Sequence, residues 1–256
     1  LLLDRSFFIG TGWKMNKTLA EGLEFSRALA DAENSFHSLI RPFIVPPFTI
    51  LREMASVLSG CRTRVGAQNM HWEDFGAWTG EISAPMIKDC GAQMVELGHF
   101  ERRRSFNETD EIIGLKVANA VKSDLIPIIC IGETALEFQS SKTKDVLHHQ
   151  VSSALKLVDS KHQDCEILLA YEPGWAIGDS GTPATVEQVS SNIDTIKNVT
   201  NDLLKREIPC LYGGSVNAEN CEQFAKCKNL DGLFIGRAAW DVQNFLHMIH
   251  LCQRIV

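Results

Sequence analysis

The segment EILLAYEPGWAIGDSGTPATVEQVSSNIDTIKNVTNDLLKRE, from Glu166 to Glu207, joins a short apolar run to a long amphipathic stretch. The first part, EILLAYE, is typical of a strand buried on both faces. After Thr185, apolar residues recur at spacings of three and four, which predicts a helix, and Thr185 with Gln188 forms a capping-box pattern at its start. A strand followed by a helix is the unit of a parallel sheet, because a crossover helix joins consecutive parallel strands.

The same unit recurs along the whole chain of 256 residues. Further helices are predicted over 20–33, 108–123, 142–158 and 241–255, the first with a capping box of Thr18 and Glu21. Eight such units predict an α/β fold, a single-domain (β/α)8 TIM barrel over residues 1–256. An open doubly wound sheet is the alternative, but no dinucleotide-binding glycine pattern follows the first strand. The eight predicted strands are FFIGT, RPFIVPP, RVGAQN, MVELGH, IPIICIGE, EILLAYE, IPCLYGG and GLFIG.

Composition narrows the possible partners. The net charge of -7 argues against binding to nucleic acid or to an anionic membrane surface, although a small anion-binding pocket can exist in an acidic protein. No apolar run approaches the roughly 20 residues of a membrane helix. The eight cysteines are scattered without a C-x-x-C pair, and the histidines lack metal-site spacing. We therefore expect a cytoplasmic protein with reduced thiols and without metal or cofactor.

In a (β/α)8 barrel, the chemistry lies at the carboxyl ends of the strands. The residues that follow the predicted strands include a possible base, an electrophile and a fixed cation, next to glycine-rich loops that can bind phosphate. Together they suggest proton abstraction beside the carbonyl of a phosphorylated substrate. These residues are Lys14, His99, Glu101, Glu172, Ser215, Gly236 and Arg237.

Seven motifs, in order along nearly the whole chain, resemble those of triosephosphate isomerases. On this resemblance the chain is identified as a member of that family. The resemblance implies interconversion of glyceraldehyde 3-phosphate and dihydroxyacetone phosphate through an enediolate, as in glycolysis and gluconeogenesis. The motifs are WKMNK at 13–17, VPPFT at 45–49, GAQN with GAWTGEIS within 66–83, ELGHFERR at 96–103, CIGE at 130–133, AYEPGWAIG at 170–178 and YGGSVN at 212–217.

The resemblance also implies the role of each catalytic residue. Glu172 is expected to be the general base, made more basic when a lid closes over it and excludes water. His99 is expected to polarise the carbonyl as a neutral imidazole, and Lys14 to supply a fixed positive charge. Glu101 is expected to belong to the polar network around them.

Further positions follow from the resemblance in the same way. The family inserts the loop that corresponds to GAWTGEIS into a neighbouring subunit, so a homodimer with Trp78 and Thr79 at the contact is implied. The expected lid consists of Pro173, Gly174, Trp175, Ala176, Ile177 and Gly178, and the expected substrate- and phosphate-binding positions are Gly12, Gly178, Ser215, Gly236 and Arg237.

Five features depart from the family pattern. Gly12 stands where the family has asparagine, and Phe100 stands where it has serine. Gly174 replaces valine in the lid hinge, which adds backbone freedom. Residues 179–181 lengthen the lid tip by about one residue, and Arg237 replaces a glycine of the last phosphate loop.

These departures leave three interpretations of the function. The first is a triosephosphate isomerase with tolerated substitutions, and we rank it narrowly first. The second is an isomerase of a four-carbon ketose phosphate, because GTGWKMNK, QNMHW and IGRAAW resemble the erythrulose-phosphate isomerases of erythritol catabolism. Gly12 would then make room for an extra hydroxymethylene carbon, and Arg237 would add a charged contact. The third is a catalytically weak barrel that acts as a binding or structural protein.

Overall fold

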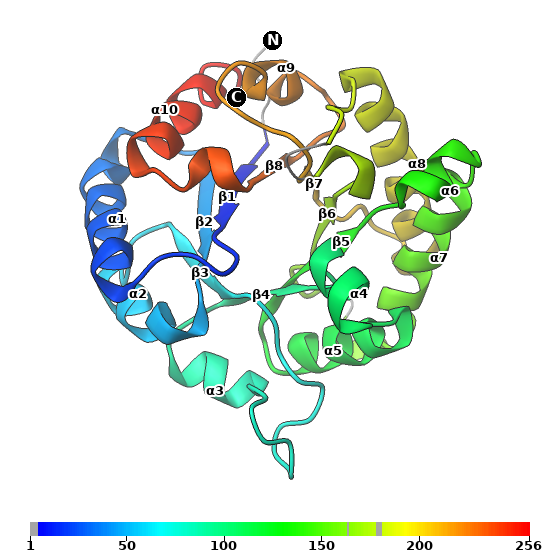
Figure 1. Ribbon diagram of the computed structural model, residues 1–256, viewed down its shortest axis with the longest axis horizontal. Coiled ribbons are helices and arrows are strands. Elements are labelled where there is room, and N and C mark those ends of the chain that lie inside the picture. The colour runs from blue at the N-terminus through cyan, green and yellow to red at the C-terminus, as the bar shows by residue number, and fades with distance from the viewer. Residues whose placement is uncertain (1–4, 163, 178–180) are drawn as a thin grey trace.

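The computed structural model describes residues 5–162, 164–177 and 181–256. These residues form eight parallel strands that pair in chain order and close into a barrel (Figure 1). Closure comes from the last strand pairing with the first, in register from Phe8 with Gly232 to Thr11 with Ile235. The predicted barrel is confirmed. The strands are β1 (Phe7–Gly12), β2 (Ile40–Val45), β3 (Arg64–Ala67), β4 (Met94–Leu97), β5 (Ile126–Ile131), β6 (Leu168–Tyr171), β7 (Cys210–Tyr212) and β8 (Gly232–Ile235).

Helices surround the barrel on its outer side (Figure 1). Both predicted capping boxes are present: the backbone N–H of Thr18 donates to Glu21 at 2.7 Å, and that of Thr185 donates to Gln188 at 2.9 Å. The helices are α1 (Leu19–Ala32), α2 (Leu51–Val57), α3 (Ala84–Asp89), α4 (Phe100–Phe106), α5 (Asp110–Lys122), α6 (Ala135–Gln139), α7 (Thr143–Leu155), α8 (Val186–Leu204), α9 (Cys221–Ala225) and α10 (Val242–Cys252).

The barrel separates two hydrophobic cores. A large one fills the space between strands and helices, and a smaller one, which includes Phe8, Phe43, Met94 and Phe234, fills the barrel itself. The interior is close-packed: a Cβ at Gly10 would lie 2.1 Å from the Phe43 ring. Because side chains alternate along a strand, only the last inward-facing residue of each strand reaches the mouth. Side-chain chemistry is therefore confined to that layer and to the loops above it.

The structure also describes the cysteines and the apolar character of the helices. All eight cysteines, which lie among the described residues, are free thiols, and five of them are buried. No helix in the described part of the chain is both long and apolar enough to cross a bilayer.

Candidate active site

A cavity of about 1170 Å³ opens at the carboxyl ends of the strands. Of the predicted lid, Gly174, Ala176 and Ile177 line it, whereas Gly178 lies outside the described residues. Trp78 and Thr79 lie elsewhere, in the exposed loop between β3 and α3. The structure brings these predicted site residues together in the wall of the cavity: Gly12, Lys14, His99, Glu101, Glu172, Ser215, Gly236 and Arg237.

Glu172 directly follows β6 and points into the mouth of the barrel. Its backbone N–H donates to the carbonyl of Ile131 at 2.7 Å, which continues the strand pairing by one residue. The residue is 4% exposed, and among the described residues its Oε2 has no hydrogen-bond partner. Burial raises the pKa of Glu172, against the opposing charges of His99 and Lys14. The result is a dehydrated carboxylate that accepts a proton more readily than a solvated one.

Two glycines make room for Glu172. A Cβ at Gly213 would lie 2.7 Å from Glu172 Cγ, and a Cβ at Gly132 would lie 2.1 Å from the Glu172 carbonyl oxygen. Sequence analysis interpreted the glycines of YGGSVN as part of a phosphate loop. Gly213 instead provides space for the carboxylate, a role that sequence spacing alone does not reveal.

His99 lies at the N-terminus of α4 with a defined orientation. Its Nδ1 accepts a hydrogen bond from the backbone N–H of Glu101 at 3.2 Å. Because Nδ1 accepts, a neutral ring carries its proton on Nε2. Nε2 lies 3.6 Å from Oε2 of Glu172, so the N–H is directed into the space beside the carboxylate.

Lys14 is held by its backbone and by Glu101. Its φ of 52° falls in the left-handed region, which is costly for a residue with a Cβ, and Gln68 donates to its carbonyl oxygen at 2.8 Å. The ammonium donates to Glu101 Oε1 at 2.8 Å. Burial raises the pKa of Glu101, but the hydrogen bond and charge of Lys14 outweigh burial and leave that pKa lowered. Glu101 therefore stays ionised and keeps a cation in place at the cavity wall.

Glu96 is a site residue that sequence analysis missed. It lies within β4, is 7% exposed, and lines the cavity. Burial raises the pKa of Glu96 to about 7, an effect that the charge of His99 opposes and that of Glu172 reinforces. A carboxylate within the apolar run MVEL was the available signal, the same kind of signal that drew attention to Glu172.

Glu96, His99 and Glu172 offer ligand atoms that all lie within 4.8 Å of one another. Zinc binds nitrogen and carboxylate donors of this kind. However, the positive charge of Lys14 acts on the same carboxyl groups and opposes a second cation. We therefore assign no metal ion to this cluster.

The first part of the expected lid packs against the barrel. Trp175 Nε1 donates to Glu133 at 2.8 Å, and the Ser215 hydroxyl donates to the carbonyl oxygen of Ala176 at 2.6 Å. A Cβ at Gly236 would meet nothing within 4 Å, so this glycine borders open space. Ser215 follows β7, and Gly236 and Arg237 follow β8, so these three residues line the part of the cavity wall that continues from Glu172 at the end of β6.

Two of the departures from the family pattern are in contact with each other. A Cβ at Gly174 would lie 2.4 Å from Cε2 of Phe100. The Phe100 ring therefore occupies the space that a larger residue in the lid hinge would need. The guanidinium of Arg104, another cavity residue, lies 5.4 Å from the centre of the same ring.

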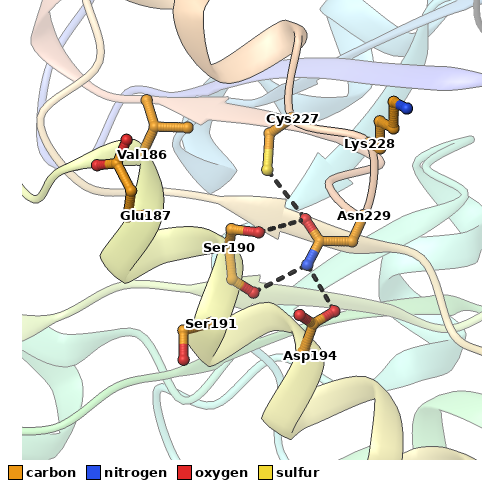
Figure 2. A pocket seen from close by; sticks show the side chains of 8 residues that line it. All are labelled: Val186, Glu187, Ser190, Ser191, Asp194, Cys227, Lys228 and Asn229. Carbon is orange, nitrogen blue, oxygen red and sulfur yellow. Dashed lines mark hydrogen bonds between the residues drawn. The ribbon is translucent and has the colours of Figure 1, made fainter.

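A second hollow lies on the outer side of the barrel, between α8 and the segment before β8 (Figure 2). Its polar groups satisfy one another. The Asn229 amide donates to the Ser190 carbonyl at 2.8 Å and to Asp194 at 2.6 Å, and its oxygen accepts from the Ser190 hydroxyl and the Cys227 thiol. These contacts attach α8 to the neighbouring loop, and we interpret this hollow as structural.

The chain matches one known protein family over nearly its whole length. A sequence model of one protein family, described as triosephosphate isomerase, matches residues 7–252. The chain belongs to the triosephosphate isomerase family. It is a sugar-phosphate isomerase, which excludes the interpretation as a mere binding or structural barrel.

Curated members of the triosephosphate isomerase family that resemble this chain carry another name. L-erythrulose-1-phosphate isomerase of Brucella abortus biovar 1 (strain 9-941) is 51% identical over 246 residues, which cover 96% of each chain. The protein of that name from Rhizobium rhizogenes is 50% identical and covers 96% of this chain and 94% of its own. The one from Rhizobium meliloti is 47% identical over 249 residues.

These relatives correct our first interpretation of the substrate. Ranking triose phosphate first was wrong, and the inferred role in glycolysis and gluconeogenesis loses its basis. The structure also changes the interpretation of Gly12. We had interpreted Gly12 as the tolerated loss of a polar side chain, whereas a carboxyl oxygen of Glu96 lies 3.9 Å from where its Cβ would be.

The raised pKa of Glu96 predicts a pH-dependent stability. Because the folded-state pKa lies above the ordinary 4.5, the contribution of this carboxyl to stability is present in full below pH 4.5 and is lost as the pH rises through 7. A pKa raised from 4.5 to about 7 corresponds to about 3 kcal/mol. Urea unfolding at pH 5 and pH 8 should show Glu96→Gln gaining up to that amount relative to wild type. Glu53→Gln, at an exposed glutamate, is the control, and parallel pH curves for wild type and Glu96→Gln would contradict the prediction.

The contact between Phe100 and Gly174 predicts a coupled pair. Gly174→Val forces a side chain into the Phe100 ring, and overpacking of this kind costs about 1–3 kcal/mol. We expect a 10- to 100-fold lower kcat/KM. Adding Phe100→Ser to the same chain should restore most of the activity, because it vacates the contested space. If the double variant instead loses the product of the two single losses, the residues are not coupled.

Proposed function

We propose that this chain isomerises L-erythrulose 1-phosphate by moving its ketone from C2 to C3. The observation that supports this substrate most strongly is the 47–51% identity, over nearly the whole chain, to proteins named for it. Gly12 supports it independently, because it leaves the cavity wall without a side chain where the family has asparagine.

The chemistry of the substrate accounts for the shared family machinery. L-erythrulose 1-phosphate is dihydroxyacetone phosphate with a hydroxymethyl group in place of one hydrogen on the carbon that loses a proton. Its ketone is on C2, and C1 carries the phosphate. The proton that leaves therefore comes from C3, and its return to C2 yields erythrulose 4-phosphate. One C–H bond breaks and another forms, so the reaction needs no oxidant or reductant.

Each catalytic side chain has a step in this reaction. Glu172 removes the C3 proton and delivers it to C2, consistent with its burial and its unpaired Oε2. The Nε2–H of His99 donates to the developing enediolate, and the ring moves the hydroxyl proton from O3 to O2. Lys14 stabilises the negative charge of the enediolate. Triosephosphate isomerase itself illustrates the pairing of a glutamate base with a neutral histidine.

The cavity wall that follows β7 and β8 is proposed to bind the phosphate. Backbone N–H groups at Gly236 and Arg237, with the Ser215 hydroxyl, suit a phosphate group, and Gly178 is expected to join them. The lid, residues 173–178, would close over the substrate and exclude water. The Ser215 hydroxyl bond to Ala176 supports a link between phosphate loop and lid.

The substrate assignment is tested by kcat/KM on L-erythrulose 1-phosphate and on dihydroxyacetone phosphate. We expect the tetrulose to be preferred by at least about tenfold, and NMR in D₂O to show deuterium incorporated at C2 of the substrate skeleton. Glu172→Ala should abolish both activities, and Glu172→Asp should lower kcat sharply with little change in KM. Preference for the triose would refute the substrate, and unchanged turnover of Glu172→Asp would refute the base.

We also propose a homodimer. The loop between β3 and α3 projects from the barrel (Figure 1), with Phe75 83% exposed and Trp78 47% exposed. Trp78 packs against the His71 ring at 4.4 Å, which gives the loop a defined shape. Exposed aromatic groups of this kind mark an interaction surface, and in the triosephosphate isomerase family this loop enters a neighbouring subunit. Thr79 would then approach the partner's active site.

Light scattering coupled to size exclusion tests the dimer. The wild type should have about twice the chain mass of 28.5 kDa. Trp78→Asp should give the single-chain mass, because it places a charge in the proposed interface. Leu136→Asp, at a residue 73% exposed on α6, is the matched control and should keep the mass of the wild type. A single-chain mass for the wild type would refute the dimer.

The free thiols support a reducing compartment, and we propose the cytoplasm as the location. Residues 1–256 are proposed to act as one domain, because the elements from Phe7 to Cys252 all belong to the barrel.

A further inference from the structure

Glu96 is an acidic residue for which the proposed reaction has no use. It lies on β4 one inward-facing position beyond Met94, above an interior core of apolar side chains. The thiol of Cys130 donates a weak hydrogen bond to its Oε1 at 3.8 Å. Its Oε2 is not one of the fully buried atoms without a partner among the described residues, and Glu96 lines the cavity. A carboxyl group in the cavity wall with one weak hydrogen bond has capacity left to bond a ligand.

Oε2 faces the space that Gly12 leaves open. A Cβ at position 12 would lie 3.9 Å from Glu96 Oε2 and 3.1 Å from Cζ of Phe234. All three residues line the cavity. Gly12 and Glu96 therefore border one recess, in which the first supplies room and the second supplies a polar group.

This recess adjoins the reacting carbons rather than the phosphate. The ligand atoms of Glu96, His99 and Glu172 lie within 4.8 Å of one another. In the proposed reaction Glu172 acts at C3 and His99 acts at the oxygens of C2 and C3. The hydroxymethyl group that distinguishes the tetrulose from a triose is bonded to C3. A group so attached extends from the carbon beside Glu172 to the neighbouring carboxyl of Glu96.

We propose that Glu96 is a specificity-determining residue, whose carboxyl hydrogen-bonds the C4 hydroxyl of the four-carbon ketose phosphate in the recess beside Gly12. This inference rests on the proposed function. A hydroxyl group both donates and accepts, so it matches the carboxyl in either protonation state.

The charges in the cavity are consistent with this role. Burial raises the pKa of Glu96 to about 7, so near neutral pH part of the population carries a proton on this carboxyl. The protonated carboxyl adds no charge beside Glu172 and an anionic substrate, and it donates a hydrogen bond as well as accepting one.

The test compares wild type and Glu96→Val on L-erythrulose 1-phosphate and on its 4-deoxy analogue, in which a methyl group replaces the hydroxymethyl group. In the wild type, removal of the hydroxyl should lower kcat/KM about 100-fold, because it leaves the carboxyl unpaired. Glu96→Val should lose about as much on the full substrate and should no longer distinguish the two compounds. Equal losses on both compounds, or no loss, would overturn the role of Glu96.

Further variants separate this role from a structural one. Glu96→Gln keeps hydrogen-bonding groups and should lose only about tenfold on the full substrate, while still preferring it over the analogue. Met94→Val, at the neighbouring interior position on β4, should leave that preference unchanged. Competitive inhibition by inorganic phosphate should be the same in wild type and Glu96→Val, which shows that the phosphate side is intact. Loss of the preference in Met94→Val would indicate a packing effect and overturn the proposal.

The same measurements distinguish failure of the proposed function from failure of the proposed role of Glu96. A wild type that turns over dihydroxyacetone phosphate but not L-erythrulose 1-phosphate refutes the proposed function and, with it, the recess. A wild type that prefers the tetrulose yet treats the 4-deoxy analogue equally well refutes only Glu96. This second comparison needs no variant, so it remains decisive even if Glu96→Val fails to fold.

Discussion

The dehydrated carboxylate of Glu172 is the feature on which the mouth of the barrel depends. Its backbone stays paired to Ile131, so the side chain is aimed by a rigid strand rather than by a loop. Gly132 and Gly213 provide the space, and removal of water raises the carboxyl pKa. The positive charge of Lys14 limits the cost of burial. A carboxylate that is both fixed in place and shielded from water needs all of these contributions at once.

The departures from the family pattern have partners in space. Phe100 packs where a side chain at Gly174 would lie, and Glu96 places a carboxyl beside the space at Gly12. Taken singly, Gly12 looks like a lost polar contact and Gly174 like a loosened hinge. In the structure, however, the space at Gly12 is bordered by Glu96, and the space at Gly174 is filled by Phe100. This is why the substitutions were first interpreted as tolerated within a triose-specific enzyme.

The charges in the cavity differ from the net charge of the whole chain. The chain carries -7 overall, yet its cavity presents Lys14, Arg104 and Arg237 together with the carboxylates. The electrostatic potential at a phosphorylated sugar in the cavity is set mainly by the cavity side chains, because they are close to it and the surrounding protein has a low dielectric constant. Charges on the distant surface contribute less. An acidic net charge is therefore compatible with a small anionic substrate.

The sequence by itself determined the parallel strands with crossover helices, because the alternation of apolar runs with amphipathic stretches is a local pattern. The number of units predicted a barrel, and the pairing of β1 with β8 in the tertiary structure closes it. The sequence also predicted that Lys14, His99 and Glu172 lie at one end of the barrel, since each follows a strand within a recognisable motif, and all three line the cavity. It could not reveal that Glu96 faces Gly12, or that Phe100 faces Gly174, because these residues are 84 and 74 positions apart and meet only when the barrel closes. Tertiary structure decided the shape of the recess between Gly12 and Glu96, since that shape depends on contacts between strands that are distant in sequence.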